Sequence, residues 1–346
     1  MTSLSESGMP RKRPTMKNVA DLAGVGVKTV SRVINQERYV SADTIARVMR
    51  AAEQLQYQPD VQAGNLRRAD RRTDTLGLLV GSVANPFSAA VHRAVEDAAI
   101  QRHVAVFASS LDDDPERERA SVEAFLRRRV DGLILTTIQR SQAYLGPQLE
   151  QGMPVVFVDR KPNGLIADTV LTDNLEGAAR GTRHLLAAGH RRIAFLGDSE
   201  EIYTAKERKR GYLDALRLEG VAPDPRLVIE NLGEEAQAEL AVNELLALDD
   251  PPTAIFSAQN LITIGAIIAL RAQGASERVA LVGFDDVPMA SLLSPAVTVV
   301  AQDPSAIGAI AARRIFERLD GESEPARDFI VPTRLIKRGS GEIRPA

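Results

Sequence analysis

The pattern of hydrophobic and polar positions changes its period near residue 75. Before that point, apolar residues recur at helical spacing in three short stretches: 16–23, 27–34 and the stretch that follows Ser41. Beyond it, short apolar runs alternate with longer segments of helical pattern. The pattern therefore predicts a small helical unit followed by a body of alternating strands and helices.

Each predicted helix of the N-terminal unit has one apolar face. The positions expected to face its core are Val19, Leu22, Ala23, Val30, Val33, Ile34, Ile45, Val48, Met49, Ala52 and Leu55. Gly24 to Gly26 separate the first two helices by a tight break, and Ser41 is a good N-cap for the third. Two short helices joined by a glycine-containing turn are typical of a helix-turn-helix, although plain helical bundles share this spacing.

The apolar runs of the body predict strands that are buried on both faces. They cover 76–80, 104–108, 133–137, 155–158, 193–196, 254–257 and 279–284. Helical patterns lie between most of them, at 89–102, 115–129, 176–188 and 262–273. Strands of this kind that alternate with helices predict parallel sheets covered on both sides. Roughly 270 residues are long for one such sheet, so we expect two similar lobes.

Charge is divided unequally between the two parts. Residues 1–72 hold thirteen Lys and Arg against seven Asp and Glu, a net charge of +6, whereas the rest of the chain has a net charge of −9. A basic head on an acidic body indicates that the head binds a polyanion. A solvated charged face would explain the same balance.

Composition excludes several classes of protein. The apolar fraction of 44% and the charged fraction of 26% exclude a disordered or fibrous chain. No apolar run is long enough to span a bilayer, and residues 1–14 lack the apolar segment of a secretory signal. The absence of cysteine excludes a disulfide scaffold, a thiol nucleophile and the usual structural zinc site. We therefore expect a cytoplasmic protein.

The sequence also lacks the common motifs of catalysis and metal binding. The chain has no phosphate-binding loop, dinucleotide fingerprint, zinc-protease motif or nucleophile elbow, and its four histidines lack metal-ligand spacing. His184 and His190, near a predicted helix end, are expected at the surface or in capping roles. The run from Asp112 to Asp114 resembles a paired-carboxylate site, but capping of the next helix explains it better. We expect no enzyme, no cofactor and no metal.

Two stretches of the head, MKNVADLAGV at 16–25 and KTVSRVIN at 28–35, closely resemble the DNA-binding head of the lactose-repressor (LacI/GalR) family. The resemblance continues along nearly the whole chain, at 57–66, 129–134, 154–160, 189–195, 282–285 and 332–336. It implies a repressor-type dimer with a head, a hinge helix and a two-lobed body like that of periplasmic sugar-binding proteins.

Pattern and resemblance together divide the chain into three parts. We predict an all-helical helix-turn-helix head at 14–58, a hinge helix or linker at 59–72, and an α/β body with parallel sheets at 73–346 that binds an effector and dimerises. The lobes of the body are expected at 73–171 plus 303–330 and at 172–302 plus 331–346.

The second helix of the head is the predicted reading helix. Lys and Arg can donate hydrogen bonds to guanine O6 and N7, and Thr can contact a base edge or a phosphate. At Gly26 the family usually has Ser, which would cap this helix and touch a phosphate. In the hinge, the resemblance implies that Leu66 is an apolar wedge in the minor groove of the operator. The predicted contacts with a near-palindromic double-stranded operator are Met16, Val27, Lys28, Thr29, Ser31, Arg32, Asn35 and Leu66.

The predicted strand ends supply candidates for an effector site, because ligands of open parallel sheets bind beyond the carboxyl ends of the strands. Together with Arg208, which matches a ligand-gripping arginine of the family, these candidates are Asn85, Phe87, Asp159, Arg160, Arg208, Asn260 and Asp285. A carboxylate or a guanidinium group can bind two adjacent hydroxyls, which favours a sugar or polyol over a purine. Structural capping is the alternative for Asp159 and Asp285.

Three functions compete on these observations. The first is a sequence-specific DNA-binding regulator, a repressor, whose operator affinity is controlled by a small molecule bound between the lobes. A solute-binding protein of the same fold would leave residues 15–58 unexplained and would need a signal peptide. A sugar-modifying α/β enzyme would need a nucleophile or phosphate loop that the motifs do not supply. The regulator accounts for the whole chain.

Overall fold

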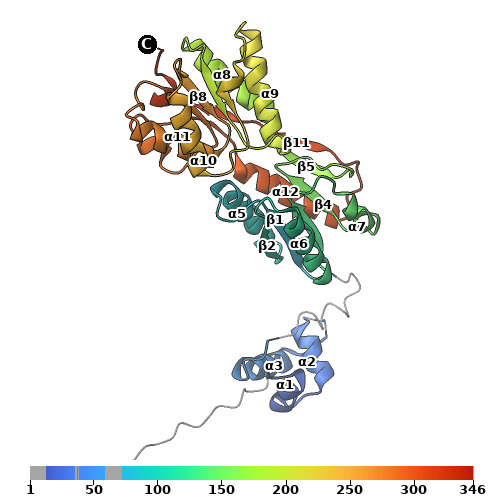
Figure 1. Cartoon of the computed structure of the whole chain (residues 1–346). Helices are drawn as coiled ribbons and strands as arrows, with labels where there is room; N and C mark the ends of the chain where they lie inside the picture. Colours follow the sequence, from blue (N-terminus) through green and yellow to red (C-terminus); the bar gives the residue numbers. More distant parts are fainter. Residues whose placement is uncertain (1–12, 36, 38, 59–71, 346) are drawn as a thin grey trace, which may run out of the picture. The chain divides into compact units, whose positions relative to one another are not determined.

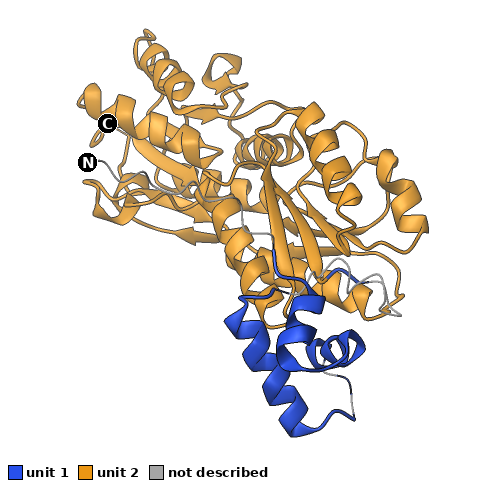
Figure 2. Cartoon of the chain, turned by 90° about the horizontal axis from the view of Figure 1, so that it is seen from below, with its two compact units in different colours: residues 1–73 blue, residues 74–346 orange. Residues whose placement is uncertain are grey.

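A computed structural model describes residues 13–35, 37, 39–58 and 72–345. The chain forms two compact units, residues 1–73 and 74–346, which Figure 2 colours blue and orange. The predicted hinge at 59–72, with Leu66, falls almost entirely outside the described residues. Among the described helices, none is long and apolar enough to cross a membrane.

The first unit consists of the three expected helices, α1 (Met16–Ala23), α2 (Val27–Ile34) and α3 (Ala42–Gln54). Thr15 caps α1 in a capping box with Asn18, and the side chain of Ser41 accepts a hydrogen bond from the first turn of α3. Gly24 ends α1 with a φ of 64°, a left-handed conformation that favours glycine. The predicted helix-turn-helix is confirmed.

The core of this first unit is shifted toward small residues. Its buried members are Val19, Ala20, Ala23, Val30, Val33, Val48, Ala51 and Ala52. The prediction was wrong for Leu22, Ile45 and Met49, which are 47%, 41% and 52% exposed. Each short helix packs against two others, and alanine allows the backbones to approach closely. The buried stripe therefore passes through alanines, and the larger neighbours lie at its edge.

The second unit contains two six-stranded sheets. The first has the order β11-β5-β4-β3-β1-β2, with every neighbouring pair parallel. Its strands are β1 (Thr75–Val80), β2 (Ala105–Ser110), β3 (Gly132–Leu135), β4 (Val155–Val158), β5 (Asp168–Thr172) and β11 (Asp328–Val331). Thus the first lobe takes one strand from near the end of the chain.

The second sheet has the order β12-β10-β9-β8-β6-β7 and is parallel except for the pair β10 and β12. Its strands are β6 (Ile193–Leu196), β7 (Val228–Ile229), β8 (Ala254–Ser257), β9 (Ala280–Phe284), β10 (Thr298–Ala301) and β12 (Arg334–Ile336). The predicted fold class, a helical head and two lobes with parallel sheets, is confirmed.

Helices cover both faces of each sheet (Figure 1). Around the first sheet lie α5 (Pro86–Ile100), α6 (Pro115–Arg127), α7 (Gly146–Glu150) and α12 (Pro304–Leu319). Around the second lie α8 (Asn174–Ala187), α9 (Tyr203–Leu218), α10 (Glu235–Leu246) and α11 (Asn260–Ala272). Short 3-10 turns occur at Ala143–Leu145, Pro225–Leu227, Ala290–Leu292 and Gly339–Gly341. Buried apolar clusters fill the space between each sheet and its helices.

The chain crosses between the two sheets near residues 173, 302 and 332, after β5, β10 and β11. Two of these crossovers are joined, because Thr172 Oγ1 donates a 2.5 Å hydrogen bond to Gln302 Oε1. Asp173 accepts a hydrogen bond from the backbone amide of Thr333 at 2.7 Å, which joins the first crossover to the third. The segments that connect the lobes therefore form one hydrogen-bonded group.

His190 corrects an expectation, because it is fully buried rather than at the surface. Its Nδ1 lies 2.9 Å from Thr253 Oγ1, and its Nε2 lies 2.9 Å from the carbonyl oxygen of Ile343. Burial lowers its pKa, and the hydrogen bond with Ile343 acts in the opposite direction. The ring ties the C-terminal segment to the second sheet, a contact that spacing in the sequence could not reveal.

Candidate effector cleft and DNA-binding surface

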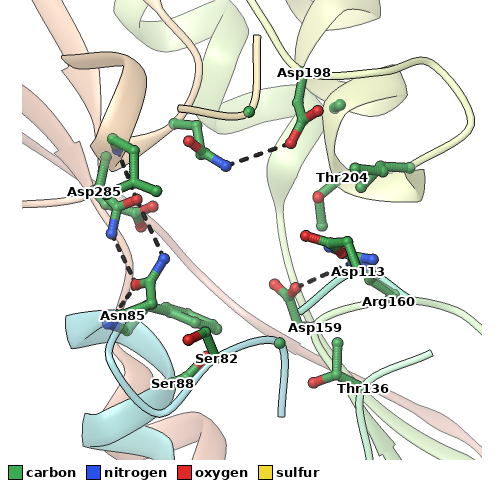
Figure 3. Close-up of a pocket in the computed structure, with 18 of the residues that line it drawn as sticks. Ser82, Asn85, Ser88, Asp113, Thr136, Asp159, Arg160, Asp198, Thr204 and Asp285 are labelled. Carbon is green, nitrogen blue, oxygen red and sulfur yellow. Dashed lines mark hydrogen bonds and ion pairs between the residues drawn. The ribbon is translucent and has the colours of Figure 1, made fainter. Parts of the chain in front are cut away.

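A polar cleft lies between the carboxyl ends of the two sheets of the second unit (Figure 3). It encloses about 270 Å³ and receives residues from the loops after β1, β2, β3, β4, β6, β8 and β9. All seven predicted effector residues are in its lining: Asn85, Phe87, Asp159, Arg160, Arg208, Asn260 and Asp285. The rule that ligands bind beyond the carboxyl ends of parallel strands (the strand-end rule) thus identified residues that are far apart in the sequence but line one cleft.

Asn85 and Asn260 face each other from different lobes. Asn260 Nδ2 donates a 2.9 Å hydrogen bond to Asn85 Oδ1, and the reverse contact from Asn85 Nδ2 to Asn260 Oδ1 is 3.4 Å. Asn85 is also the N-cap of α5, where its side chain accepts a hydrogen bond from the Phe87 amide. Asn260 opens α11. The pair links the first turns of two helices across the cleft.

Arg208 is a buried cation with fixed geometry. It lies on α9, is 5% exposed, and donates from Nε to Asn174 Oδ1 and from Nη1 to the Ala258 carbonyl, both at 2.7 Å. Its guanidinium carbon is 3.8 Å from the centre of the Phe284 ring, within cation–π range. Burial lowers its pKa, and the charges of Asp285 and Asp159 oppose that shift.

Asp159 and Asp285 follow β4 and β9 with φ angles of 67° and 72°. This left-handed conformation is one that Asp tolerates better than most residues. Asp285 Oδ1 accepts a 2.7 Å hydrogen bond from Gln302 Nε2. Burial raises the pKa of both carboxyls, with Arg160 and Arg208 opposing the shift at Asp159, and Arg208 and Gln302 opposing it at Asp285.

The capping alternative for these two aspartates finds no support in the hydrogen bonds. Among the described residues, neither carboxylate accepts a hydrogen bond from the backbone of the segment that follows it. Their side chains are instead turned toward the cleft, as Figure 3 shows for both. The capping role therefore does not explain why aspartate occupies these positions.

The acidic run 112–114 serves two purposes. Asp114 caps α6, as predicted, and accepts a hydrogen bond from the Glu116 amide at 2.9 Å. Asp112 and Asp113 do not cap the helix but line the cleft, which corrects the capping interpretation for them. Asp113 Oδ1 accepts a 2.8 Å hydrogen bond from Arg160 Nη2. Asp112 and Asp113 both have left-handed backbone conformations, and the Asp112 side chain is paired with Arg117 of α6.

Several lining residues were not predicted. They include Ser82, Ser88, Asp112, Asp113, Thr136, Asp198, Thr204, Gln259 and Gln302. Asp113 and Asp198 follow predicted strands and Thr136 lies near the end of one, so the strand-end rule points to these positions as well. Gln302 follows β10, which the hydrophobic pattern did not predict, and no sequence signal pointed to it.

The predicted DNA-binding residues of α2 differ in exposure. Val27, Lys28 and Arg32 are exposed, as is Asn35, whereas Thr29 and Ser31 are half-buried. Arg32 Nε lies 3.5 Å from Glu37 Oε2. Met16 is half-buried against the core of the first unit. Gly26 is the N-cap of α2 and supplies no side-chain hydrogen bond. Leu66 lies outside the described residues.

Comparison with known proteins decides the family. Residues 15–60 match the family described as "Bacterial regulatory proteins, lacI family". Residues 73–339 match "Periplasmic binding proteins and sugar binding domain of LacI family". The chain belongs to the LacI family. The head and the cleft described above are therefore parts of a LacI-family DNA-binding transcriptional regulator, rather than of a solute-binding protein without a DNA-binding head.

Relatives of this LacI-family chain are similar over almost their full length. The "Ribose operon repressor" of Haemophilus influenzae is 31% identical over 329 residues, covering 94% of this chain and 98% of the relative. The "HTH-type transcriptional repressor PurR" of Pasteurella multocida is 29% identical over 95% of this chain and 99% of the relative. Both relatives are named as transcriptional repressors.

Solved structures give the same result. The "lac repressor dimer bound to operator and the anti-inducer ONPF" has a TM-score of 0.85 at 26% identity, covering 95% of this chain and 99% of that chain. The "transcriptional regulator CelR-cellobiose complex" has a TM-score of 0.69 at 32% identity, covering 95% of this chain and 100% of that chain. The two-lobed LacI-family fold is shared throughout.

Proposed function

We propose that this LacI-family regulator is a repressor that binds a near-palindromic operator as a homodimer and changes its operator affinity when a sugar-like molecule occupies the cleft. The observation that supports this proposal is a chain of hydrogen bonds that runs from the cleft to the crossover segments. Asp285 binds Gln302, and Gln302 accepts a hydrogen bond from Thr172. A ligand that engages Asp285 therefore acts on a residue at the junction between the lobes.

The chemistry of the cleft supports a small polyhydroxylated effector. Its seven predicted residues combine carboxylates, guanidinium groups and amides with a single aromatic ring, Phe87. A volume of about 270 Å³ is just below the ~300 to 1,000 Å³ typical of small-molecule pockets. Two related structures are described with a bound sugar, cellobiose at 32% identity and ribose at 25% identity. We infer that Asp285 and Arg208 hold adjacent hydroxyls of the effector.

The head supports the DNA-binding part of the proposal. Lys28 and Arg32 project from an exposed face of α2, opposite the buried Val30 and Val33. The proposal places this face in the major groove. Dimerisation of the body would present two heads to two half-sites, and Leu66 of each hinge would enter the minor groove between them.

The remaining expectations follow from the family. Relatives are transcriptional repressors, so we propose that the chain acts by binding DNA and effector and catalyses no reaction. A regulator that binds the chromosome works in the cytoplasm, which agrees with the location expected from the sequence. No cofactor or metal is required for this action.

The proposal is tested with the full chain and with a chain that lacks residues 1–72. An operator is first selected from random duplex DNA with the full chain, and affinity for it is measured by fluorescence anisotropy. We expect the shortened chain to lose both operator binding and retention on heparin, because the basic charge and α2 are removed together. Equal retention of the two chains on DNA would reject the regulator.

A further inference from the structure

The charged groups that line the effector cleft are unbalanced. The described lining contains five carboxylates, Asp112, Asp113, Asp159, Asp198 and Asp285, and two cationic side chains, Arg160 and Arg208. Asp112 is paired with Arg117, which lies outside the lining. The four other carboxylates therefore share two arginines, and the hydrogen bonds of those arginines decide what charge the cleft can accept.

Each of the two arginines uses two of its five N–H donors within the protein. Arg208 donates to Asn174 and to the Ala258 carbonyl, which leaves Nη2 without a hydrogen-bond partner among the described residues. Arg160 donates from Nη1 to the Thr137 carbonyl and from Nη2 to Asp113. The remaining nitrogen of Arg160, Nε, lies 3.9 Å from Asp159. Both arginines keep open donors, but carboxylates of the cleft neighbour each of them, so neither offers an unbalanced positive charge to a ligand anion.

The carboxylates, in contrast, keep open acceptor positions. Asp159 accepts no hydrogen bond from the described residues, and among these residues its one oppositely charged partner within 4 Å is Arg160. Asp285 accepts one, from Gln302, through Oδ1 alone. Asp198 accepts hydrogen bonds from the Ser199 amide and, at 3.4 Å, from Gln259. An ionised carboxylate has about four acceptor positions, so the cleft has a surplus of acceptors.

The direction of the pKa shifts that burial causes agrees with this surplus of acceptors. Burial raises the pKa of Asp159, Asp198 and Asp285, and the neighbouring arginines only partly oppose the shift. The charge of Asp113 adds to the upward shift of the Asp198 pKa. A ligand that donates hydrogen bonds would satisfy these groups, whereas an anion would add another charge of the same sign.

We propose that the cleft selects an uncharged or positively charged effector and rejects phosphorylated and carboxylated sugars. This inference rests on the proposed function of the cleft and specifies the class of its ligand. Hydroxyl and amino groups donate to Asp159, Asp198 and Asp285, and one hydroxyl oxygen accepts from Arg208 Nη2. A phosphate ester brings a charge of about −1.5 to −2 and acceptor oxygens only. It would face open carboxylates and two arginines whose charges those carboxylates already balance.

Asp198 is the residue that we assign to this selection. It follows β6, opposite Asp113, and no arginine donates a hydrogen bond to it in the described structure. Repulsion by such a group lowers the affinity of an anion. Asp198→Asn removes the charge and keeps the shape of the side chain.

The test is a thermal-shift and calorimetry panel on the full chain, arranged as matched sets. Each set contains a free pentose or hexose, its amino derivative where one exists, its phosphate and its acid. We expect stabilisation only by free and amino sugars, with the phosphate of any binding sugar at least about 100-fold weaker. A phosphate or acid that binds as tightly as its free sugar would overturn the inference, and so would a panel in which no member binds.

Asp198→Asn and the matched control Asp249→Asn complete the test. Asp249 is exposed and is not part of the cleft lining, so its variant has the same change of charge without the same location. We expect Asp198→Asn to reduce the discrimination against the phosphate about tenfold, and Asp249→Asn to leave it unchanged. Unchanged discrimination in Asp198→Asn would show that this carboxylate does not select the ligand. Melting of each variant without ligand checks its folding.

Failure of the inference and failure of the proposed function give different results. A sugar phosphate that binds the cleft and alters operator affinity would leave the regulator intact and overturn the charge selection. A free sugar that binds selectively but does not alter operator affinity would leave the charge selection intact and count against effector control.

Discussion

The head and the cleft use cationic side chains in opposite ways. In the head, Lys28 and Arg32 are exposed on a single helix. In the cleft, Arg160 and Arg208 have low exposure and bond mainly to carbonyl, amide and carboxylate oxygens of the protein. Exposed cations can attract a polyanion, whereas buried cations hold the shape of a site and leave the carboxylates to meet the ligand. The position of a charge therefore tells more about its role than its sign.

The strongest test of the cleft side of this comparison is Asp285→Ala. We expect the best free sugar of the panel to lose affinity by about 2–5 kcal/mol, because removal of one member of a buried polar contact leaves its partners unpaired. Isothermal calorimetry measures the loss, and Asp249→Ala serves as the control. Full-strength binding by Asp285→Ala would remove this residue from the site.

Arg32→Ala tests the head side. If Arg32 reads a base, operator affinity should fall by about 1–3 kcal/mol and specificity should relax at one position of each half-site. Arg50→Ala makes the same change of charge on α3, where the side chain bonds to the Ala46 carbonyl. Anisotropy with single-base operator variants separates the two. Unchanged affinity and specificity in Arg32→Ala would exclude base reading by this residue.

The two sides also differ in how far the sequence predicted them. The head depends on local spacing, so its three helices and the Ser41 cap were predicted, although Leu22 and Met49 were placed in the core. In the cleft, the strand-end rule found Asp159 and Asp285 because each follows a predicted apolar run. Asp113 and Asp198 also follow predicted runs, whereas Gln302 follows a strand that depends on tertiary contacts.

Gln302 was missed because the strand before it, β10, was missed. A polar residue begins each of the strands β5, β10, β11 and β12. Two of these residues, Asp168 of β5 and Thr298 of β10, are buried by partners from elsewhere in the chain. Asp168, for instance, accepts hydrogen bonds from Arg314 and Arg318 on α12. A local hydrophobic pattern cannot show such pairing, and Gln302 after β10 was therefore not considered.

A smaller effect is expected at the contact between the lobes. The hydrogen bonds between Asn85 and Asn260 should couple these residues by about 0.5–1.5 kcal/mol in the effector-free protein. A double-mutant cycle with Asn85→Ala and Asn260→Ala, read from chemical denaturation, isolates this coupling from the separate capping role of Asn85. Additive single effects would mean that the pair does not hold the lobes together.

The smallest effect concerns His190, which belongs to neither functional surface. Burial lowers its folded-state pKa below the unfolded value of 6.5. The stability gained from the neutral ring is therefore present above pH 6.5 and is lost as pH falls through the folded-state pKa. We expect the unfolding free energy of His190→Gln to depend less on pH between 6.5 and 5 than that of the unchanged chain. Equal slopes in denaturation series would contradict this assignment.

Whether the cleft controls the head is tested most directly by measuring operator affinity with and without the best free sugar of the panel. If the cleft controls operator binding, we expect saturating sugar to change the operator affinity of the unchanged chain about 5- to 150-fold. The midpoint of that change should follow the dissociation constant of the sugar, and Asp285→Ala should show no change at the same concentration. A sugar that fills the cleft and leaves operator affinity unaltered would contradict the account.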